Sequence, residues 1–311
     1  MKILAAFAGG LLAALLLAAP AQAQNARSFV SGHGLDTNAC TLSAPCRTFA
    51  AALALTNAGG EITVLDPAGY GPVTIDKTIS IVNDGVGTAG VIVPSGGNGI
   101  TINAGSNDAV MLRGLSIDGA GVGTSGIAFN SGKSLTVVSC VIRHFTGDGI
   151  SFFPTASSNL AVTNTLTADN GGDGAFIHPT GNGVVAAVFN HIKANNNSGD
   201  GIALVGSDST GTINATVSDS VAAGNSSIGF VAATAPSHAP TTLMVFHSVA
   251  ADNGFGLYTI GAAATLRVAH TVVTGNGTGW IVLSGAVLSY GDNYIDGNNG
   301  GETAPPSTAQ K

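Results

Sequence analysis

The sequence predicts an all-β protein, a parallel β-helix in which short strands stack in turns along a solenoid. Three observations support this prediction. A pattern recurs about every 26 residues, apolar and polar residues alternate within each repeat, and the chain has 45 glycines among its 311 residues. The glycines fit an architecture with a tight turn in every repeat, because glycine adopts positive φ at no steric cost.

Two columns of residues define the repeat. In the first, a glycine precedes an apolar position that holds Ile100, Ile127, Ile150, Ala175, Ile202, Phe230, Leu257 and Trp280. In the second, an asparagine comes shortly before that glycine, at Asn170, Asn196, Asn225, Asn253, Asn276 and Asn298. We expect these asparagines to form a ladder of amides, because equivalent side chains in successive turns lie about 4.8 Å apart.

Between these columns the apolar residues alternate, as in Leu160-x-Val162-x-Asn164-x-Leu166, and the segments 215–221, 243–249 and 266–272 repeat the pattern. Each repeat therefore holds roughly three short strands, which pair with the strands of the repeats before and after. Leucine-rich repeats, propellers and the calcium-binding nonapeptide solenoid are excluded by their consensus residues or their repeat lengths.

The chain opens with a segment typical of an export signal. Lys2 precedes an apolar run from 3 to 19, and Ala21-Gln22-Ala23 has the small-x-small pattern that signal peptidase accepts, so we expect cleavage after Ala23. An uncleaved anchor is the alternative, and no later stretch is apolar for long enough to span a bilayer. We therefore expect a secreted protein, in the periplasm or outside the cell.

An exported protein can hold disulfides. Cys40 and Cys46 flank the short segment 41–45, and we expect a bond between them rather than two independent thiols. The pair has too few neighbouring ligands for a zinc site, so no metal is expected there. Cys140 is expected to be a small packed residue.

A short amphipathic segment is expected to cap the N-terminal end of the solenoid. Phe49, Ala52, Leu53 and Thr56 fall on one face of a helix, and Gly59-Gly60 would end it. Such a cap covers the open edge of the first turn. The predicted organisation is a signal peptide at 1–23, a cap at 24–60, the β-helix at 61–299 and a disordered tail at 300–311.

The charge of the chain excludes some partners. It has 10 Lys and Arg against 17 Asp and Glu, for a net charge of -7. Binding to phosphates requires clustered basic residues, so nucleic acid is not an expected partner. A hydrophobic content of 45% argues against intrinsic disorder.

These features resemble the right-handed parallel β-helix superfamily with the pectate-lyase-like fold, and specifically exported bacterial β-helix-repeat proteins. The resemblance rests on segments 29–36, 45–49 and 59–62 and on the Asn-x-x-Asp-Gly-Ile type of repeat, and it covers almost the whole mature chain. It implies a right-handed coil. Because the superfamily includes pectate lyases, polygalacturonases, alginate-modifying enzymes and non-catalytic adhesins, it does not select a function.

The candidate catalytic residues lie in the middle repeats. Asp148, Asp173 and Asp200 each precede a glycine at one turn, and stacking would raise their pKa values or attract a cation such as Ca²⁺. Strand parity places His178 on the outer face, where it could act as a general acid or base, and Arg143 is close in sequence. The alternative is that each aspartate accepts backbone hydrogen bonds in its own turn, and that His178 is an exposed polar residue.

The same outer face carries Phe153, Phe176 and Tyr258, whose rings are candidates for stacking on sugars. The face is unusually apolar, so we expect it to be covered by the turns of the chain or to contact a partner or a second copy. For Trp280 we expect core packing rather than sugar binding.

His247 and His270 fall in another column. We place them with Asn164, Asn190, Asp219 and Asp292 and interpret the column as a polar corner rather than as a metal site, because it is polar in every repeat.

The function predicted from these features is binding or organising cell-surface polysaccharide, or another glycan of the cell envelope, without catalysis. One alternative is a polysaccharide lyase, glycoside hydrolase or uronate epimerase that acts on an acidic glycan. Another is a structural or adhesive surface protein. No cofactor is expected apart from the Ca²⁺ considered above.

Overall fold

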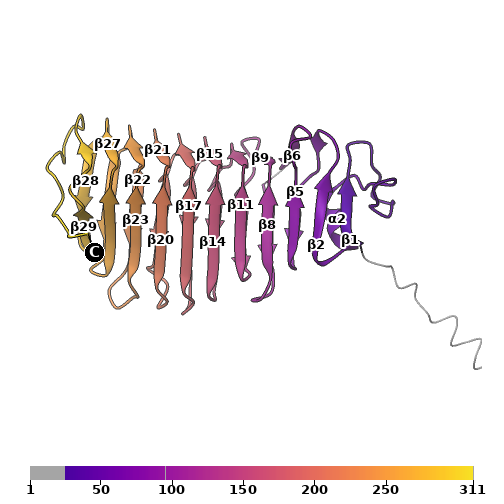
Figure 1. Cartoon of the computed structure of the whole chain (residues 1–311), viewed down its shortest axis with the longest axis horizontal. Coiled ribbons are helices and arrows are strands. Elements are labelled where there is room, and N and C mark those ends of the chain that lie inside the picture. The colour runs from indigo at the N-terminus through magenta and orange to yellow at the C-terminus, as the bar shows by residue number, and fades with distance from the viewer. Residues whose placement is uncertain (1–24, 95, 311) are drawn as a thin grey trace, which may run out of the picture.

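The computed structural model describes residues 25–94 and 96–310, so the predicted signal peptide at 1–23 lies outside the described residues. The described chain forms an elongated solenoid whose strands stack from the N-terminal end to the C-terminal end (Figure 1). In residues 25–94 and 96–310, no helix has the length and hydropathy needed to cross a bilayer.

Three parallel sheets form the walls of the solenoid. Sheet A consists of β1 (Asn25–Val30), β2 (Thr56–Val64), β5 (Ile79–Val82), β8 (Ala109–Arg113), β11 (Ser134–Val138), β14 (Ser158–Thr163), β17 (Val185–Asn190), β20 (Ile213–Ser218), β23 (Thr241–Phe246), β26 (Ala264–Ala269) and β29 (Ala286–Ser289). Sheet B consists of β4 (Val73–Ile75), β7 (Ile100–Asn103), β10 (Ile127–Ser131), β13 (Ile150–Phe152), β16 (Ala175–Ile177), β19 (Ile202–Val205), β22 (Ile228–Ala233), β25 (Phe255–Ile260) and β28 (Thr278–Val282). Sheet C consists of β3 (Ala68–Gly69), β6 (Ala89–Ile92), β9 (Leu115–Asp118), β12 (Val141–Arg143), β15 (Leu166–Ala168), β18 (Lys193–Asn195), β21 (Val221–Ala223), β24 (Val249–Ala251), β27 (Val272–Thr274) and β30 (Tyr294–Ile295).

The strand register confirms the glycine column of the sequence. In sheet B, Ile127 pairs with both Ile100 and Ile150, and the column continues to the pair of Leu257 and Trp280. Since equivalent residues of successive repeats pair directly, one repeat corresponds to one turn of the solenoid.

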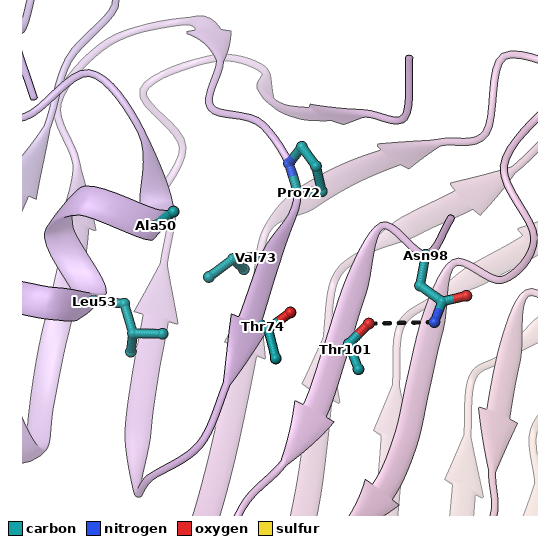
Figure 2. Close-up of a pocket in the computed structure, with 7 residues that line it drawn as sticks. All are labelled: Ala50, Leu53, Pro72, Val73, Thr74, Asn98 and Thr101. Carbon is teal, nitrogen blue, oxygen red and sulfur yellow. Dashed lines mark hydrogen bonds between the residues drawn. The ribbon is translucent and has the colours of Figure 1, made fainter. Parts of the chain in front are cut away.

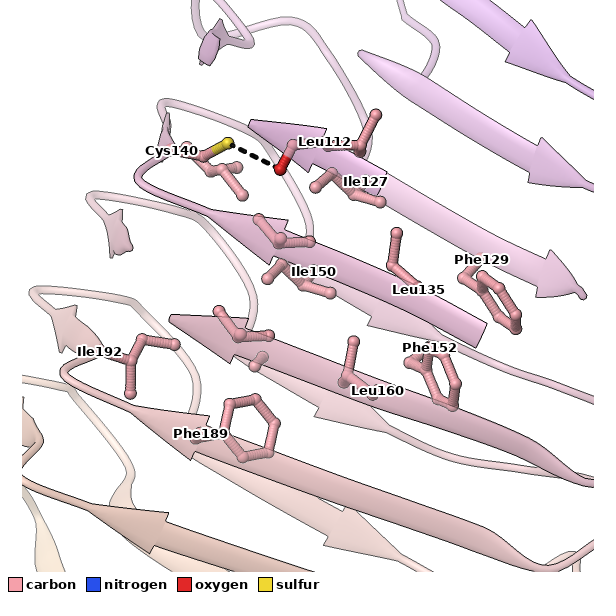
Figure 3. Close-up of a cluster of buried hydrophobic side chains, with 14 of the residues drawn as sticks. Leu112, Ile127, Phe129, Leu135, Cys140, Ile150, Phe152, Leu160, Phe189 and Ile192 are labelled. Atoms are coloured by element: carbon pink, nitrogen blue, oxygen red, sulfur yellow. Dashed lines mark hydrogen bonds between the residues drawn. The ribbon is translucent and has the colours of Figure 1, made fainter. Parts of the chain in front are cut away.

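The core is a continuous column of apolar side chains inside the three sheets. Figure 3 shows its middle part, where Phe129 and Phe152 stack with ring centroids 4.4 Å apart. Cys140 is buried there as a free thiol, as expected. Full burial of one large apolar side chain stabilises a fold by about 1.5–3 kcal/mol, so the stacked core provides the main stabilisation.

A ladder of asparagines runs along the turn between sheets C and B. In each member except the last, Nδ2 donates to the Oδ1 of the asparagine in the next turn over 2.8 to 3.0 Å; the members are Asn170, Asn197, Asn225, Asn253, Asn276 and Asn298. The prediction of Asn196 in this ladder is therefore wrong. Asn196 is exposed with a φ of 56°, whereas Asn197 lies four residues before the column glycine, as Asn170 and Asn225 do.

The N-terminal cap contains the predicted helix, α2 (Phe49–Leu55). Thr48 caps it by accepting a hydrogen bond from the Ala51 amide, and Phe49, Ala52 and Leu53 are buried. The disulfide between Cys40 and Cys46 is present, as predicted.

Both ends of the solenoid differ from the predicted boundaries. The cap region begins with β1, which pairs with β2, and β2 itself starts at Thr56, before the expected start of the solenoid at 61. The prediction of a disordered tail is wrong for residues 300–310. The Trp280 indole donates to the carbonyl of Thr303 over 2.6 Å, and Ser289 pairs with Ser307, so the tail covers the last turn.

Candidate functional site

The three candidate aspartates occupy one turn of the solenoid and bond to the backbone. Asp148 Oδ1 accepts from the amide of Asp173 over 3.0 Å, and Asp173 Oδ1 accepts from the amide of Asp200 over 2.7 Å. Asp200 Oδ1 accepts from the amide of Ile228 over 2.9 Å. One oxygen of each carboxylate thus holds the next turn, whereas the alternative in the sequence analysis placed such bonds within the aspartate's own turn.

Asp173 is the aspartate of this turn with the strongest perturbation. Burial, together with the neighbouring carboxylates of Asp200 and Asp148, raises its pKa to about 7 against the opposing effect of the hydrogen bond from the Asp200 amide. Burial also raises the pKa of Asp200. The carboxyl group of Asp173 therefore titrates near neutral pH.

Arg143 does not join the other catalytic candidates. It lies in β12 of sheet C, where its Nε is 3.2 Å from Oδ2 of Asp118, and His144 Nδ1 lies 3.2 Å from the same oxygen. His178 follows β16 in sheet B. The predicted catalytic set is therefore divided between different faces of the solenoid.

His178 instead belongs to an aromatic cluster on the outer face of sheet B. The ring centroids of Phe153 and Phe176 are 5.3 Å apart, and those of Phe176 and His178 are 5.2 Å apart. His178 Nε2 lies 2.8 Å from Oδ2 of Asp208. Tyr258, the third predicted ligand-binding aromatic, lies nearer the C-terminal end and contacts Phe255 at 5.7 Å.

The apolar stripe on this outer face is closed in its middle and open near its C-terminal end. Val231 is 4% exposed, whereas Leu283 is 59% exposed. Trp280 is partly buried against the core, as its expected packing role requires.

A second polar column lies at the corner where sheet A passes into sheet C. Its residues have φ between 48° and 54° and comprise Ser139, Asn164, His191, Asp219, His247 and His270. Left-handed backbone at non-glycine positions is uncommon and enriched in Asn, Asp and His, which explains the residue types. Asn190, which the sequence analysis placed in this column, is the last residue of β17 and pairs with Ser218, so His191 takes its place.

Beside the corner runs a row of residues that begin the strands of sheet C. Successive strands pair Val141, Leu166, Lys193, Val221, Val249, Val272 and Tyr294 in one register. The row is apolar or aromatic at every position except Lys193. The corner column and this row line two pockets, which we name after Tyr294 and Lys193.

The Tyr294 pocket has a volume of about 800 Å³ and contains His247, His270 and Asp292 beside Tyr294. The Tyr294 side chain is 74% exposed, and Phe246, which is 40% exposed, contacts the ring of His270 at 5.4 Å. The pocket therefore combines open aromatic surface with polar groups.

Two imidazole–carboxylate pairs order the polar groups of the Tyr294 pocket. His247 Nδ1 lies 2.6 Å from Oδ1 of Asp219, and His270 Nε2 lies 3.1 Å from Oδ2 of Asp292. The hydrogen bond from His247 lowers the pKa of Asp219, so this carboxylate is ionised at neutral pH. In the described part of the chain, no group of three or more His, Cys, Asp or Glu side chains is arranged to hold a metal ion.

The Lys193 pocket, of about 430 Å³, is lined by Ser139, Val141, Asn164, Leu166 and His191 together with Lys193. It lies on the same corner as the Tyr294 pocket, and the turn with Asp219 and Val221 separates the two. Sequence reasoning recognised the polar column but missed both pockets, because exposure at a corner depends on the bend between two sheets.

A third pocket, of about 380 Å³, lies at the N-terminal cap (Figure 2). Helix α2 lies beside β4, the edge strand of sheet B, and contributes Ala50 and Leu53. Because a helix cannot pair with β4 as a strand would, a hollow remains between α2 and β4. Its other lining residues are Pro72, Val73, Thr74, Asn98 and Thr101, so it has no ionisable side chain.

Comparisons with known proteins agree with this architecture. Residues 72–222, just under half of the chain, match the family model described as the right handed beta helix region. A crystal structure of pectate lyase Pel9A superposes with a TM-score of 0.59 at 17% identity, over 93% of this chain and 78% of that one. A rhamnogalacturonan lyase superposes with a TM-score of 0.52 at 16% identity, over 80% of this chain and 76% of that one. No curated protein matches the sequence. The chain therefore has the fold of a right-handed parallel β-helix, and in its architecture it is similar to these two lyases.

Proposed function

We propose that the protein is exported and binds a polysaccharide at the Tyr294 pocket without cleaving it. The observation that carries this proposal is the open ring of Tyr294 beside two imidazole–carboxylate pairs. A sugar ring presents C–H groups that stack on aromatic faces and hydroxyl groups that bond to carboxylates and imidazoles. The pocket supplies both kinds of contact.

The arrangement of the acidic groups favours binding over catalysis. A glycoside hydrolase requires two carboxyl groups that are free to act on one glycosidic bond. Here the carboxylates of Asp148, Asp173 and Asp200 hold backbone amides, and those of Asp219 and Asp292 are paired with histidines.

Two further observations support a polysaccharide ligand outside the cytoplasm. The disulfide between Cys40 and Cys46 requires an oxidising compartment in most organisms. The two structural neighbours are, by their names, a pectate lyase and a rhamnogalacturonan lyase, and such enzymes act on polysaccharides.

One contact favours a second candidate, a polysaccharide lyase. Asp219 holds His247 through Nδ1, and Nε2 of His247 has no partner within the described residues. In many enzymes a carboxylate orients an imidazole in this way, and the imidazole then acts as a general base through its other nitrogen. In a lyase, that base would remove the proton beside the sugar carboxyl group while the glycosidic oxygen leaves.

Retention of the purified mature protein on immobilised neutral and acidic polysaccharides tests both candidates, with unsaturated products followed by absorbance. We expect retention without product, and we expect Tyr294→Ala to weaken binding about tenfold, the equivalent of one stacking contact. Tyr258→Ala is the matched control and should bind as the wild type does.

If the wild type forms unsaturated product and His247→Ala forms none, the protein is a lyase and the proposal of binding without cleavage is wrong. Absence of both retention and product on every polysaccharide would contradict both candidates.

A further inference from the structure

We infer that the bound polysaccharide lies along the axis of the solenoid, over the corner, and that Lys193 binds a carboxylate on it. The polymer would reach from the Tyr294 pocket to the Lys193 pocket. Its chemical class is a linear heteropolysaccharide in which acidic sugars are separated by neutral ones. The inference rests on the proposed function, and it adds the direction of the chain and the class of sugar.

The two pockets are aligned and lie a few sugar units apart. They share the corner column and the row at the start of sheet C, and β18 and β30 are four strand positions apart in that sheet. At about 4.8 Å per strand the separation is about 19 Å. An extended glycan repeats at nearly the spacing of the strands, so about four to six sugars would reach both pockets.

The surface that runs from Lys193 through the separating turn into the Tyr294 pocket presents similar chemistry in each turn. Val221, Val249 and Val272 offer apolar contact, and the corner column places one polar side chain beside each of them. A repeating surface of this kind suits a repeating ligand, because each sugar meets an apolar residue and a hydrogen-bonding group.

The Lys193 pocket contains polar groups without partners. Within the described residues, the side chains of Ser139, Asn164 and Lys193 make no hydrogen bond or ion pair, and all three are exposed. The histidines of the Tyr294 pocket are paired with carboxylates, so the two pockets differ in the groups that remain for a ligand.

Lys193 is the cation of a row that is otherwise apolar or aromatic. An ammonium group beside a hydroxyl and an amide recognises a carboxylate by charge and by hydrogen bonds. Towards the other pocket, Asp219 and Asp292 would repel further carboxylates. A polymer with a carboxylate on every sugar is therefore disfavoured, and one with alternating acidic and neutral sugars fits.

Three length series test the inference by calorimetry: hyaluronan oligosaccharides with alternating acidic sugars, neutral cello-oligosaccharides, and oligogalacturonates with a carboxylate on every sugar. For the wild type we expect the affinity for hyaluronan to rise about tenfold between the disaccharide and the hexasaccharide, since only the longer chain reaches Lys193. We expect Lys193→Gln to remove this gain and to leave the affinity for neutral oligosaccharides unchanged.

Lys133→Gln is the matched control, because Lys133 is also exposed but lies outside both pockets. Absence of a length-dependent gain, or a gain that persists in Lys193→Gln, overturns the inference. The proposed function stands in that case if short neutral oligosaccharides still bind and Tyr294→Ala weakens this binding about tenfold. If no series binds at all, the inference and the proposed function fail together.

Discussion

The two polar columns of this solenoid look alike in sequence and differ in what their side chains bond to. In the turn between sheets C and B, the asparagines and aspartates bond to one another or to backbone amides of the next turn. At the corner between sheets A and C, the side chains are more exposed, and some have no partner within the described residues. A recurring polar residue is therefore a structural element where its bonds are internal and a candidate binding group where they are not.

Removing a member of the asparagine ladder should have the largest effect. Asn225 donates to Asn253 and to the carbonyl of Ala194, and its Oδ1 accepts from Asn197. Asn225→Leu leaves these buried partners unpaired, so we expect the free energy of unfolding to fall by about 3 kcal/mol or more in chemical denaturation.

The neighbouring Asn196 provides the control for this loss. It is exposed with positive φ, which glycine adopts without strain, so Asn196→Gly should change the free energy of unfolding by less than about 0.5 kcal/mol. Equal losses in the two variants would contradict the assignment of Asn197 to the ladder.

Asp173→Asn should stabilise the protein at pH 8. Because burial raises the pKa of Asp173 to about 7, the folded state binds more protons than the unfolded state between about pH 4 and pH 7, and stability falls as pH rises through that range. In Asp173→Asn, the new side chain keeps an oxygen that accepts from the backbone amide of Asp200, and it carries no charge. We expect the free energy of unfolding to rise by about 1–3 kcal/mol at pH 8, which is less than the full pKa shift of Asp173 would give, and to be unchanged at pH 4.

Asp219→Asn should act in the opposite direction at the corner. The hydrogen bond from His247 lowers the pKa of Asp219, so its contribution to stability is present above the unfolded pKa of about 4 and is lost as pH falls. We expect a small loss of thermal stability at pH 7 that disappears under acidic conditions. A gain at pH 7 would show that the pair with His247 is unfavourable.

The sequence predicted most of the fold because repetition makes register visible. The glycine column identified residues that pair in sheet B, and the alternating pattern identified the strands of sheet A. Two of the column errors, Asn196 for Asn197 and Asn190 for His191, fall where polar residues are adjacent in the sequence, so the pattern located the column only to within one residue. Counting from the neighbouring glycine would have corrected the first error.

The candidate site was less accessible to sequence reasoning. The sequence left a catalytic and a backbone-bonding role open for the aspartates of one turn, because it does not show which amides their oxygens bond to. Tyr294 and Phe246 drew no attention, since their exposure depends on the bend between two sheets. The end of the chain was misjudged because the acceptor for the Trp280 indole lies in a segment without apolar periodicity.

The most direct test of the difference between the columns measures two variants side by side, Tyr294→Ala at the corner and Asp173→Asn in the turn. Polysaccharide affinity is measured by calorimetry and the midpoint of thermal unfolding by circular dichroism, both at pH 8. We predict that Tyr294→Ala loses affinity with an unchanged midpoint, and that Asp173→Asn raises the midpoint with unchanged affinity. Loss of affinity in Asp173→Asn with full affinity in Tyr294→Ala would contradict the account and return the binding site to the aspartate turn.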